Sequence, residues 1–536
     1  MTRRAWLVGV GVFLLYCATL SGEGGSTYGQ AYLTAQSLLE KHTLALPTSG
    51  PQVSADALGP TLVNARGERE TTTGLLWGLV VLPFYAVAHF ATGGSDAGLR
   101  GVLGKLFTGL YDPLLYGLCA ALLFSLALRL SGSSRRAWGI VLLWTFATMT
   151  WGVSKYSSYL SLLSCLLLGI LWFLAPTEDR PGRFFAAGLC FGLIVLTRAQ
   201  EAVLLPAVIL YAVLRARELP PESRLRATAA FAVPVGLGLG ALALLNLYKF
   251  GPAHPFGYTN QPLGPLDVGL WGLLLSSGRS LFLFSPPLLL GVWCLTRPQE
   301  RWRPERAFLV AAAVSLVLFY ASFRCWPGDW GDWGPRYLYP LVPLLLLPLA
   351  LVERALVRPL TFRRAALALG VVGVLAQMPG VFLRPGAYQW PLRVAQRHGA
   401  PLDPVDSYFW PQFSPVFMGY RLLFAKIESA VSGLPPEVTL EIYDFDHVVR
   451  TATVAPDAEM LRNSDFVSHT LFSLQEGTFS RSWHVPLKVT LLLRTPQAVV
   501  WIVGLLYLLR AGRREKEPAL AAGSGARLAG DGEWHG

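Results

Sequence analysis

Apolar residues gather along the chain in long runs that short polar or basic stretches separate. A helix of roughly 15 to 25 such residues crosses, or nearly crosses, a hydrocarbon core about 30 Å thick. Thirteen runs are candidates for such helices, at residues 5–20, 74–92, 107–128, 137–153, 156–175, 184–197, 200–214, 228–248, 280–296, 307–322, 337–352, 365–383 and 495–510. The pattern therefore predicts an all-α polytopic membrane protein.

The basic residues between these runs indicate which candidate does not cross. If all thirteen crossed, the loop with Arg135 and Arg136 and most later basic loops would lie outside, against the preference of Lys and Arg for the cytoplasmic side. The run at 74–92 holds Pro83 and His89 and follows a polar stretch, so we expect it to lie in the membrane interface as a helix. About twelve spans, with both chain ends in the cytoplasm, then satisfy the charge pattern.

This topology divides the chain into a membrane part and one larger external segment near the C-terminus. After Pro436, apolar residues such as Val438, Leu440 and Ile442 alternate with other types, which predicts a small, partly β structure there. The expected parts are a transmembrane domain at 1–383 with its first external loop at 21–106, the external segment at 384–490, a last transmembrane helix at 491–512 and a disordered tail at 513–536.

Composition supports the membrane assignment and removes other classes. The chain of 536 residues is 53% hydrophobic and 15% charged, whereas soluble domains carry about 25% charged residues, which excludes a soluble multidomain enzyme. Its net charge of +12 follows from the basic cytoplasmic loops, so no nucleic-acid partner is expected. Five of the six cysteines lie in apolar runs without metal-like spacing, so neither a disulfide framework nor a zinc site is predicted.

Glu23 is the first candidate catalytic residue. It follows the first apolar run in the stretch Ser-Gly-Glu-Gly-Gly, where glycines allow close approach of a ligand to a carboxylate at the membrane surface. A general base for a lipid-bound substrate fits this position, and a solvated loop residue fits it equally well. For the other acids of this loop, Asp56, Glu68 and Glu70, we expect solvated positions.

The stretch from Phe323 to Tyr337 is the most informative. An external, turn-rich loop with three Trp, two Asp and two Arg can stack on sugar faces, accept bonds from hydroxyls and pair with a phosphate. An aromatic belt at a helix end explains the Trp and Tyr residues but explains the Asp and Arg residues less well. The candidate substrate-binding residues of this loop are Arg324, Asp329, Trp330, Asp332, Trp333, Arg336 and Tyr337.

Other cations are expected on the same external face. Arg279 lies in a Ser/Gly break between two apolar runs, where a dip into the membrane would suit a phosphate headgroup, although an ordinary helix cap is as good an interpretation. Lys155 and Arg198 are further candidate substrate-binding residues, and Lys249 is expected to contact lipid headgroups. The glycines Gly236, Gly238 and Gly240 lie inside a span, so we expect them to serve helix packing rather than a nucleotide site.

No metal is required by the sequence, and no metal ligand is assigned. Glu23 with Asp329 or Asp332 would hold a divalent ion only if their loops meet.

These motifs resemble the GT-C glycosyltransferases, in particular the bacterial branch of protein mannosyltransferases, aminoarabinose transferases and Rgt-type transferases. The resemblance covers most of residues 1–383, and its last two motifs are fairly specific. It rests on Tyr28, Ser37-Leu-Leu-Glu40, Leu82-Pro-Phe-Tyr85, Leu196-Thr-Arg198, the stretch 270–287 and Trp333-Gly-Pro-Arg336-Tyr337.

The resemblance implies a bundle with an interfacial helix in its first external loop and a sugar transfer at the outer membrane face. The donor would be a polyprenyl-phosphate sugar, the acceptor a glycolipid, polysaccharide or protein of the cell envelope, and the location the bacterial inner membrane with the active site facing the periplasm or exterior. By position, Glu23 matches the family's base. The chain departs from the family at Gly24 to Thr27, where an acidic pair is common, and at Ser154 to Ser158, where metal-using members carry an acid.

Two other classes remain open from the sequence. A transporter or flippase of lipid-linked glycans would use the same cations but should carry charged or broken helices near mid-membrane. A non-catalytic membrane protein of envelope assembly would keep Trp333 to Tyr337 and tolerate substitution of Glu23. The sequence leaves the sugar, the acceptor and the oligomeric state undetermined.

Overall fold

A computed structural model describes most of the transmembrane part and several segments outside it. The described residues are 1–19, 26–46, 61–64, 66–93, 103–104, 107–155, 158–175, 180–251, 262–297, 300–328, 333–383, 388, 406–432, 438–444, 447–454 and 487–512.

Helices occupy all thirteen of the apolar runs named from the sequence. The first half of the chain forms α1 (Arg3–Thr19), α2 (Ser26–Lys41), α4 (Leu75–Ala91), α6 (Tyr111–Ser131), α7 (Ser134–Phe146), α8 (Thr150–Val153), α9 (Leu160–Leu174), α10 (Pro181–Thr197), η1 (Ala199–Leu204), α11 (Leu205–Arg217) and α12 (Pro221–Phe250). Two short strands, β1 (Thr61–Val63) and β2 (Arg69–Thr71), pair antiparallel between α2 and α4.

The second half has shorter and more interrupted helices. Its elements are α13 (Leu266–Leu275), α14 (Leu281–Phe284), α15 (Leu288–Leu295), η2 (Glu300–Trp302), α16 (Arg303–Ala321), η3 (Arg336–Leu338), α17 (Leu341–Leu346), α18 (Pro348–Leu351), α19 (Arg354–Val357), α20 (Leu360–Phe382), α22 (Asp406–Phe409), η5 (Pro411–Phe413), α23 (Pro415–Ser432), β3 (Val438–Asp444), β4 (His447–Val454) and α25 (Leu487–Gly512). The predicted span at 280–296 is divided where Pro286 and Pro287 interrupt the helix.

Within the described residues, five helical stretches are long and apolar enough to cross a membrane: Phe107–Ser131, Ala199–Arg217, Pro221–Phe250, Arg303–Ala321 and Leu360–Phe382. The prediction of a mostly helical membrane protein is confirmed, and the chain is a multi-pass membrane protein. The number of crossings, the placement of α4 in the interface and the external location of 384–490 stay predictions.

Close helix packing joins α10 to α12. A Cβ added to Gly188 would lie 2.2 Å from the carbonyl oxygen of Phe231, and one added to Gly238 would lie 2.4 Å from the Cα of Gly192. Small residues are therefore required at this crossing, as in many membrane helix pairs. The packing role predicted for Gly238 agrees with this contact, but it is wrong for Gly236 and Gly240, which have no described atom within 4 Å of an added Cβ.

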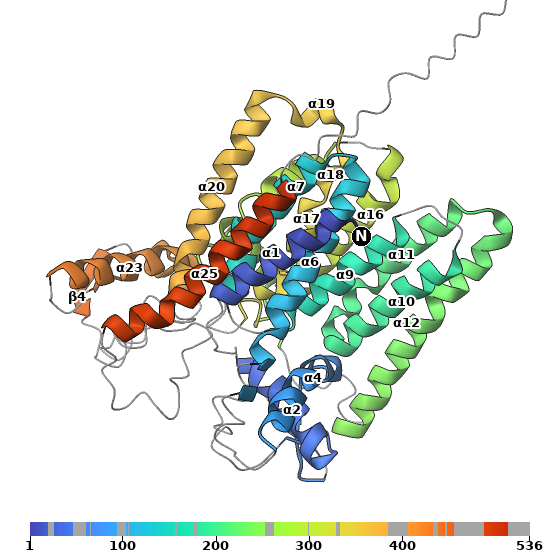
Figure 1. Cartoon of the computed structure of the whole chain (residues 1–536), viewed down its shortest axis with the longest axis horizontal. Coiled ribbons are helices and arrows are strands. Elements are labelled where there is room, and N and C mark those ends of the chain that lie inside the picture. The colour runs from blue at the N-terminus through green and yellow to red at the C-terminus, as the bar shows by residue number, and fades with distance from the viewer. Residues whose placement is uncertain are drawn as a thin grey trace, which may run out of the picture.

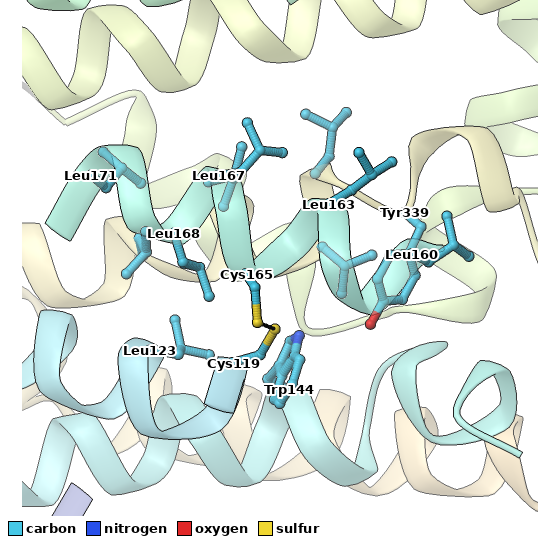
Figure 2. Close-up of a cluster of buried hydrophobic side chains, with 14 of the residues drawn as sticks. Cys119, Leu123, Trp144, Leu160, Leu163, Cys165, Leu167, Leu168, Leu171 and Tyr339 are labelled. Atoms are coloured by element: carbon cyan, nitrogen blue, oxygen red, sulfur yellow. Dashed lines mark hydrogen bonds between the residues drawn. The ribbon is translucent and has the colours of Figure 1, made fainter. Parts of the chain in front are cut away.

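The core between α6, α7 and α9 is densely apolar. Figure 2 shows Leu123 with the leucines of α9 around the sulfur atoms of Cys119 and Cys165. These two buried free cysteines lie 3.1 Å apart, Sγ to Sγ. The contact ties α6 to α9, the two helices whose outer ends approach the candidate site.

The elements predicted to be external lie at one end of the bundle. In Figure 1, α2 and α4 pack together below the long helices, beside the C-terminal end of α12. At the left of the same view, α23 and the β3–β4 hairpin extend away from the lower end of α20. The sequence predicted β structure in the 384–490 segment but not the 18-residue helix α23.

Candidate active site

Trp333 anchors the segment that carries the most specific motif. Its side chain is 6% exposed. A Cβ added to Gly152 of α8 would lie 2.3 Å from the indole Cδ1, and one added to Gly380 of α20 would lie 2.4 Å from Cε2. The indole N–H donates to Gln377 Oε1 at 2.8 Å, and Gln377 Nε2 donates to the carbonyl oxygen of Phe284 at 2.7 Å. Because protein atoms cover the ring, Trp333 positions its loop and offers no open face for stacking on a sugar.

Gly334 turns the chain out of this anchor. Its φ is +73°, a left-handed conformation that favours glycine, and an added Cβ would meet Phe284 at 3.1 Å. Its carbonyl oxygen accepts a hydrogen bond from Arg279 Nη1 at 3.1 Å and another from the backbone N–H of Arg336 at 3.0 Å. The turn thereby brings two of the predicted cations to one peptide group.

Arg279 is completely buried between α13 and α14. Its exposed fraction is 0%, and its Nη2 donates to the hydroxyl of Tyr388 at 3.3 Å. The guanidinium also lies 5.1 Å from the centroid of the Tyr408 ring. A buried cation needs such hydrogen bonds and ring contacts to offset its desolvation. Arg279 therefore fastens the α13–α14 loop, the 333–337 segment and the segment before α23 to one another.

Arg198 lies in a cage of aromatic rings after α10. Its guanidinium carbon is 4.7 Å from the ring centroid of Tyr337 and 5.2 Å from those of Tyr159 and Tyr320. Its Nη1 also pairs with Glu201 Oε1 at 3.3 Å. The sequence treated Arg198 as a substrate-binding cation, whereas its contacts in the structure are those of a buried connector between α9, α16 and the 333–337 segment.

Arg336 is the more accessible cation of this region. Its side chain is half-buried, and its guanidinium carbon lies 5.1 Å from the ring centroid of Tyr337. The Tyr337 ring stacks on Tyr320 at 4.9 Å with an interplanar angle of 12°. Tyr320 in turn donates its hydroxyl proton to Glu201 Oε1 at 2.9 Å. The Arg198 cage therefore sets the position of the side chain that contacts Arg336.

Lys155 is buried beyond the end of α8. Its ammonium group donates to the carbonyl oxygen of Leu383. Leu383 directly follows α20, the helix that supplies Gly380 to the Trp333 contact. Lys155 is thus close in structure to the 333–337 segment, although 178 residues separate it from Trp333 in sequence.

A chain of aromatic contacts links α4 to this region. The Trp77 indole N–H donates to the Tyr111 hydroxyl at 2.6 Å, and that hydroxyl donates to the carbonyl oxygen of Ser158 at 2.5 Å. Trp77 also meets Tyr159 edge to face at 5.4 Å. At the start of α4, a Cβ added to Gly74 would lie 2.2 Å from the carbonyl oxygen of Leu196. The predicted interfacial helix therefore begins against the turn that carries Arg198.

Glu70 and Lys249 are two charged residues whose burial the sequence did not reveal. Glu70 is 0% exposed, which makes the expectation of a solvated position wrong, and burial raises the pKa of its carboxyl. Lys249 is also buried and donates to the carbonyl oxygen of Thr71 at 3.2 Å, so the expected headgroup contact is wrong as well. The pattern Glu68-Arg69-Glu70 looks like a solvated charge run, and no local signal distinguishes its third member.

The remaining predicted residues are not brought into this region by described contacts. Glu23, Asp329, Trp330 and Asp332 lie outside the described residues. Arg324 is described, and its side chain is exposed while its backbone N–H donates to the Pro262 carbonyl at 3.0 Å. Across the described part of the chain, no three His, Cys, Asp or Glu side chains gather as a metal-binding set.

The described elements define a multi-pass helical membrane protein with buried cations and aromatic rings at one end of its bundle. Among solved structures, the chain is similar to two crystal structures of ArnT from Cupriavidus metallidurans. The match to ArnT bound to undecaprenyl phosphate covers 86% of this chain and 84% of that one, with 15% identity and a TM-score of 0.43. The match to the apo state covers 85% and 83%, with 15% identity and a TM-score of 0.45. No family model and no curated protein matches the chain.

Proposed function

We propose that the protein is an integral membrane glycosyltransferase of the GT-C type. It transfers a sugar from a polyprenyl-phosphate donor to a cell-envelope acceptor on the outer face of the bacterial inner membrane. The observation that carries this proposal is the gathering of Lys155, Arg198, Arg279 and Arg336 around the 333–337 segment, with tyrosine rings between them. Cations at the end of a membrane bundle suit a lipid phosphate, which leaves with negative charge when the sugar is transferred.

The cations divide into two roles. Arg336, half-buried, is the residue that contacts the donor phosphate, and Arg279, Arg198 and Lys155 hold the loops around it. Arg324, Asp329, Trp330 and Asp332 belong to the same loop, where Trp330 and Asp332 would hold the sugar ring. Tyr337 contacts Arg336 and holds its side chain in place.

The reaction follows from these roles and from Glu23. The acceptor hydroxyl oxygen attacks the anomeric carbon of the sugar, and its proton passes to the Glu23 carboxylate. The bond between the anomeric carbon and the phosphate oxygen breaks, and the polyprenyl phosphate leaves with the electron pair, stabilised by Arg336. The steps assigned to these residues use no metal ion.

The positions of the buried acids favour an enzyme over a transporter of lipid-linked glycans. Asp112 and Glu305 lie in the first turns of α6 and α16, and Glu201 lies in η1 before α11. A transport pathway through the bundle would place ionisable groups near the middle of spans, and the helix break at Pro286 and Pro287 has none within residues 280–290. Among the described spans, the buried acids are at helix ends.

The decisive experiment is a turnover assay of the purified protein in lipid with radiolabelled polyprenyl-phosphate sugars and a crude envelope acceptor. Arg336→Gln is compared with Arg297→Gln, because Arg297 is an exposed arginine after α15 at the opposite end of the bundle. We expect the wild type and Arg297→Gln to transfer sugar and Arg336→Gln to lose about tenfold or more in kcat/KM, equal to about 1.4 kcal/mol.

The variant Glu23→Gln tests the proposed general base separately from the phosphate site. Loss of transfer in Arg336→Gln but not in Glu23→Gln would remove Glu23 from the mechanism and keep the phosphate site. No transfer by wild type with any donor, while it still binds the donor, would point to a transporter or a non-catalytic protein.

A further inference from the structure

α23 is attached to the side of a predicted membrane span. The Tyr420 hydroxyl donates to the carbonyl oxygen of Leu375 in α20 at 2.7 Å. A Cβ added to Gly419 would lie 2.5 Å from the Cβ of Pro379, so the two helices touch closely. In Figure 1, α23 leaves the lower end of α20 and points away from the bundle.

The contact lies inside the apolar part of α20. Leu375 precedes Phe382, the last residue of α20, by seven positions, which is about 10 Å along a helix axis. Leu375 is itself exposed, as are Val371 and Val372 on the same helix. A spanning helix offers such a surface to lipid acyl chains. The neighbouring surface of α23 is therefore at the depth of the hydrocarbon edge.

The outward face of α23 has the composition of an interfacial helix. Phe417 is 48% exposed and Phe424 is 64% exposed, with the exposed Arg421 between them at spacings of four and three residues. The Tyr420 ring stacks on Phe424 at 6.1 Å. The opposite face packs into the protein through Val416, Met418, Leu422 and Leu423. Aromatic rings beside a long cationic side chain are typical of helices that lie at a membrane surface.

We propose that α23 is an amphipathic anchor seated in the outer leaflet of the membrane. Phe417 and Phe424 lie among acyl chains, and Arg421 extends to the lipid phosphates. The exposed surface of α20 continues directly into this face, which identifies bilayer lipid as its occupant. Residues 415–425 of the 384–490 segment are then bound to the membrane and not surrounded by water.

The anchor also bears on the candidate active site. The backbone N–H of Gly278 donates to the carbonyl oxygen of Tyr408 at 2.7 Å, and the Ser414 hydroxyl donates to the carbonyl oxygen of Ser277. Both contacts join the residues just before α23 to the loop that carries Arg279. The binding of α23 to lipid therefore restrains the loop that carries Arg279.

Spin labels test the proposal in the full-length protein in nanodiscs of phosphatidylethanolamine and phosphatidylglycerol. Labels are placed by Phe417→Cys and Phe424→Cys in a background with Cys190→Ala and Cys325→Ser, the two half-buried thiols. Val371→Cys on the lipid-facing side of α20 and Glu222→Cys at the exposed start of α12 are the lipid and water references. Collision rates with oxygen and with a water-soluble nickel complex are compared at each site.

We expect the labels at 417 and 424 to match Val371→Cys, with oxygen collisions exceeding nickel collisions. A nickel preference like that of Glu222→Cys would overturn the proposal, because the helix would then lie in water. Immobile labels that neither reagent reaches would overturn it as well, because a protein surface would then cover the face. A circular dichroism spectrum and elution volume equal to those of the background protein show that each variant is folded. This outcome is independent of sugar transfer.

Discussion

The helix pair α11 and α16, with η1 before α11, carries an Arg–Glu–Tyr cluster at each of its two ends. At the predicted cytoplasmic end, Arg215 contacts Glu305 and donates to Glu218 at 2.6 Å, and Tyr211 donates to Glu305 at 2.9 Å. At the predicted outer end, Arg198, Glu201 and Tyr320 make the corresponding contacts. At both ends, therefore, a glutamate and a tyrosine pair with a buried arginine close to the membrane surface.

The two clusters differ in what surrounds the arginine. Arg215 shares two carboxylates, so its charge is matched within the helix ends. Arg198 has Glu201 as its carboxylate contact and three tyrosine faces, one of which is Tyr337 of the candidate active site. The inner cluster therefore joins two helices. The outer cluster also fixes Tyr337, the side chain that contacts Arg336.

The largest effect is expected at the inner cluster. Arg215→Ala leaves the buried Glu305 without its cation and should lower the free energy of unfolding by about 3–5 kcal/mol. Denaturant unfolding in detergent micelles measures this loss. The double variant Arg215→Leu/Glu305→Leu should recover most of it, because no buried charge is left unpaired and the remaining Glu218 is exposed. A double variant as unstable as Arg215→Ala would show that packing, and not charge burial, dominates.

Breaking the outer cluster should lower activity beyond what its loss of stability explains, because Arg198→Gln also leaves the buried Glu201 without its cation. Arg198→Gln removes three cation–π contacts, each worth about 0.5–2 kcal/mol, and should lower sugar transfer about tenfold or more. The Arg215 variants should lose transfer only in proportion to their unfolded fraction. Transfer rates, corrected for folded protein, distinguish the two ends.

A double-mutant cycle sharpens the role of Arg198. If Arg198 acts by positioning Tyr337, Tyr337→Leu lowers transfer and adding Arg198→Gln lowers it little further. If Arg198 binds phosphate directly, the two losses multiply, and Arg198→Lys retains most of the activity.

The anchor of Trp333 should have an intermediate effect. Gln377→Leu removes the acceptor of the indole N–H and the donor to the Phe284 carbonyl, which should cost about 1–3 kcal/mol of stability. Thermal unfolding in nanodiscs measures the change. The control Gln36→Leu, at a half-buried glutamine of α2 that donates to Glu40 at 3.2 Å, should have a smaller effect. Equal losses would mean that the hydrogen bonds around Trp333 contribute no more to stability than this partly exposed one.

The smallest effect is expected from Glu70, as a dependence on pH. Burial raises the pKa of its carboxyl, so the folded protein holds this proton more tightly than the unfolded chain, whose value is about 4.3. Stability should therefore fall as pH rises from about 4 through the raised folded value. Glu70→Gln should flatten this part of the profile. Unfolding temperatures of both proteins between pH 4 and pH 8 provide the measurement, and parallel profiles would contradict the assignment.

Much of the fold was predictable because a membrane-spanning segment must be helical and must be long enough to cross the hydrocarbon core. Apolar runs must form helices where no water satisfies the backbone, so the positions of α6, α12, α16 and α20 follow directly from composition. α23 was not predicted because its apolar residues follow one face of a helix and do not form a continuous run, and the surrounding segment has a mixed composition.

For the candidate site, residue types and loops could be named from the sequence, but roles could not. The motif Trp333-Gly-Pro-Arg336-Tyr337 marked the right segment for attention, yet only its contacts distinguish the covered Trp333 from the accessible Arg336. In the sequence, Arg198 likewise does not differ from the other external cations. Its contacts with Tyr159, Tyr320 and Tyr337 distinguish it in the structure.

By itself, the sequence determined the class of protein, the apolar helices and a short set of chemically capable residues. These properties depend on composition and on the neighbours of each residue along the chain. Only the tertiary structure decided that Glu70 and Lys249 are buried and that Arg279 reaches Gly334 across 55 residues. Burial and partner choice depend on residues far apart in the chain, because desolvation and hydrogen bonding act through space.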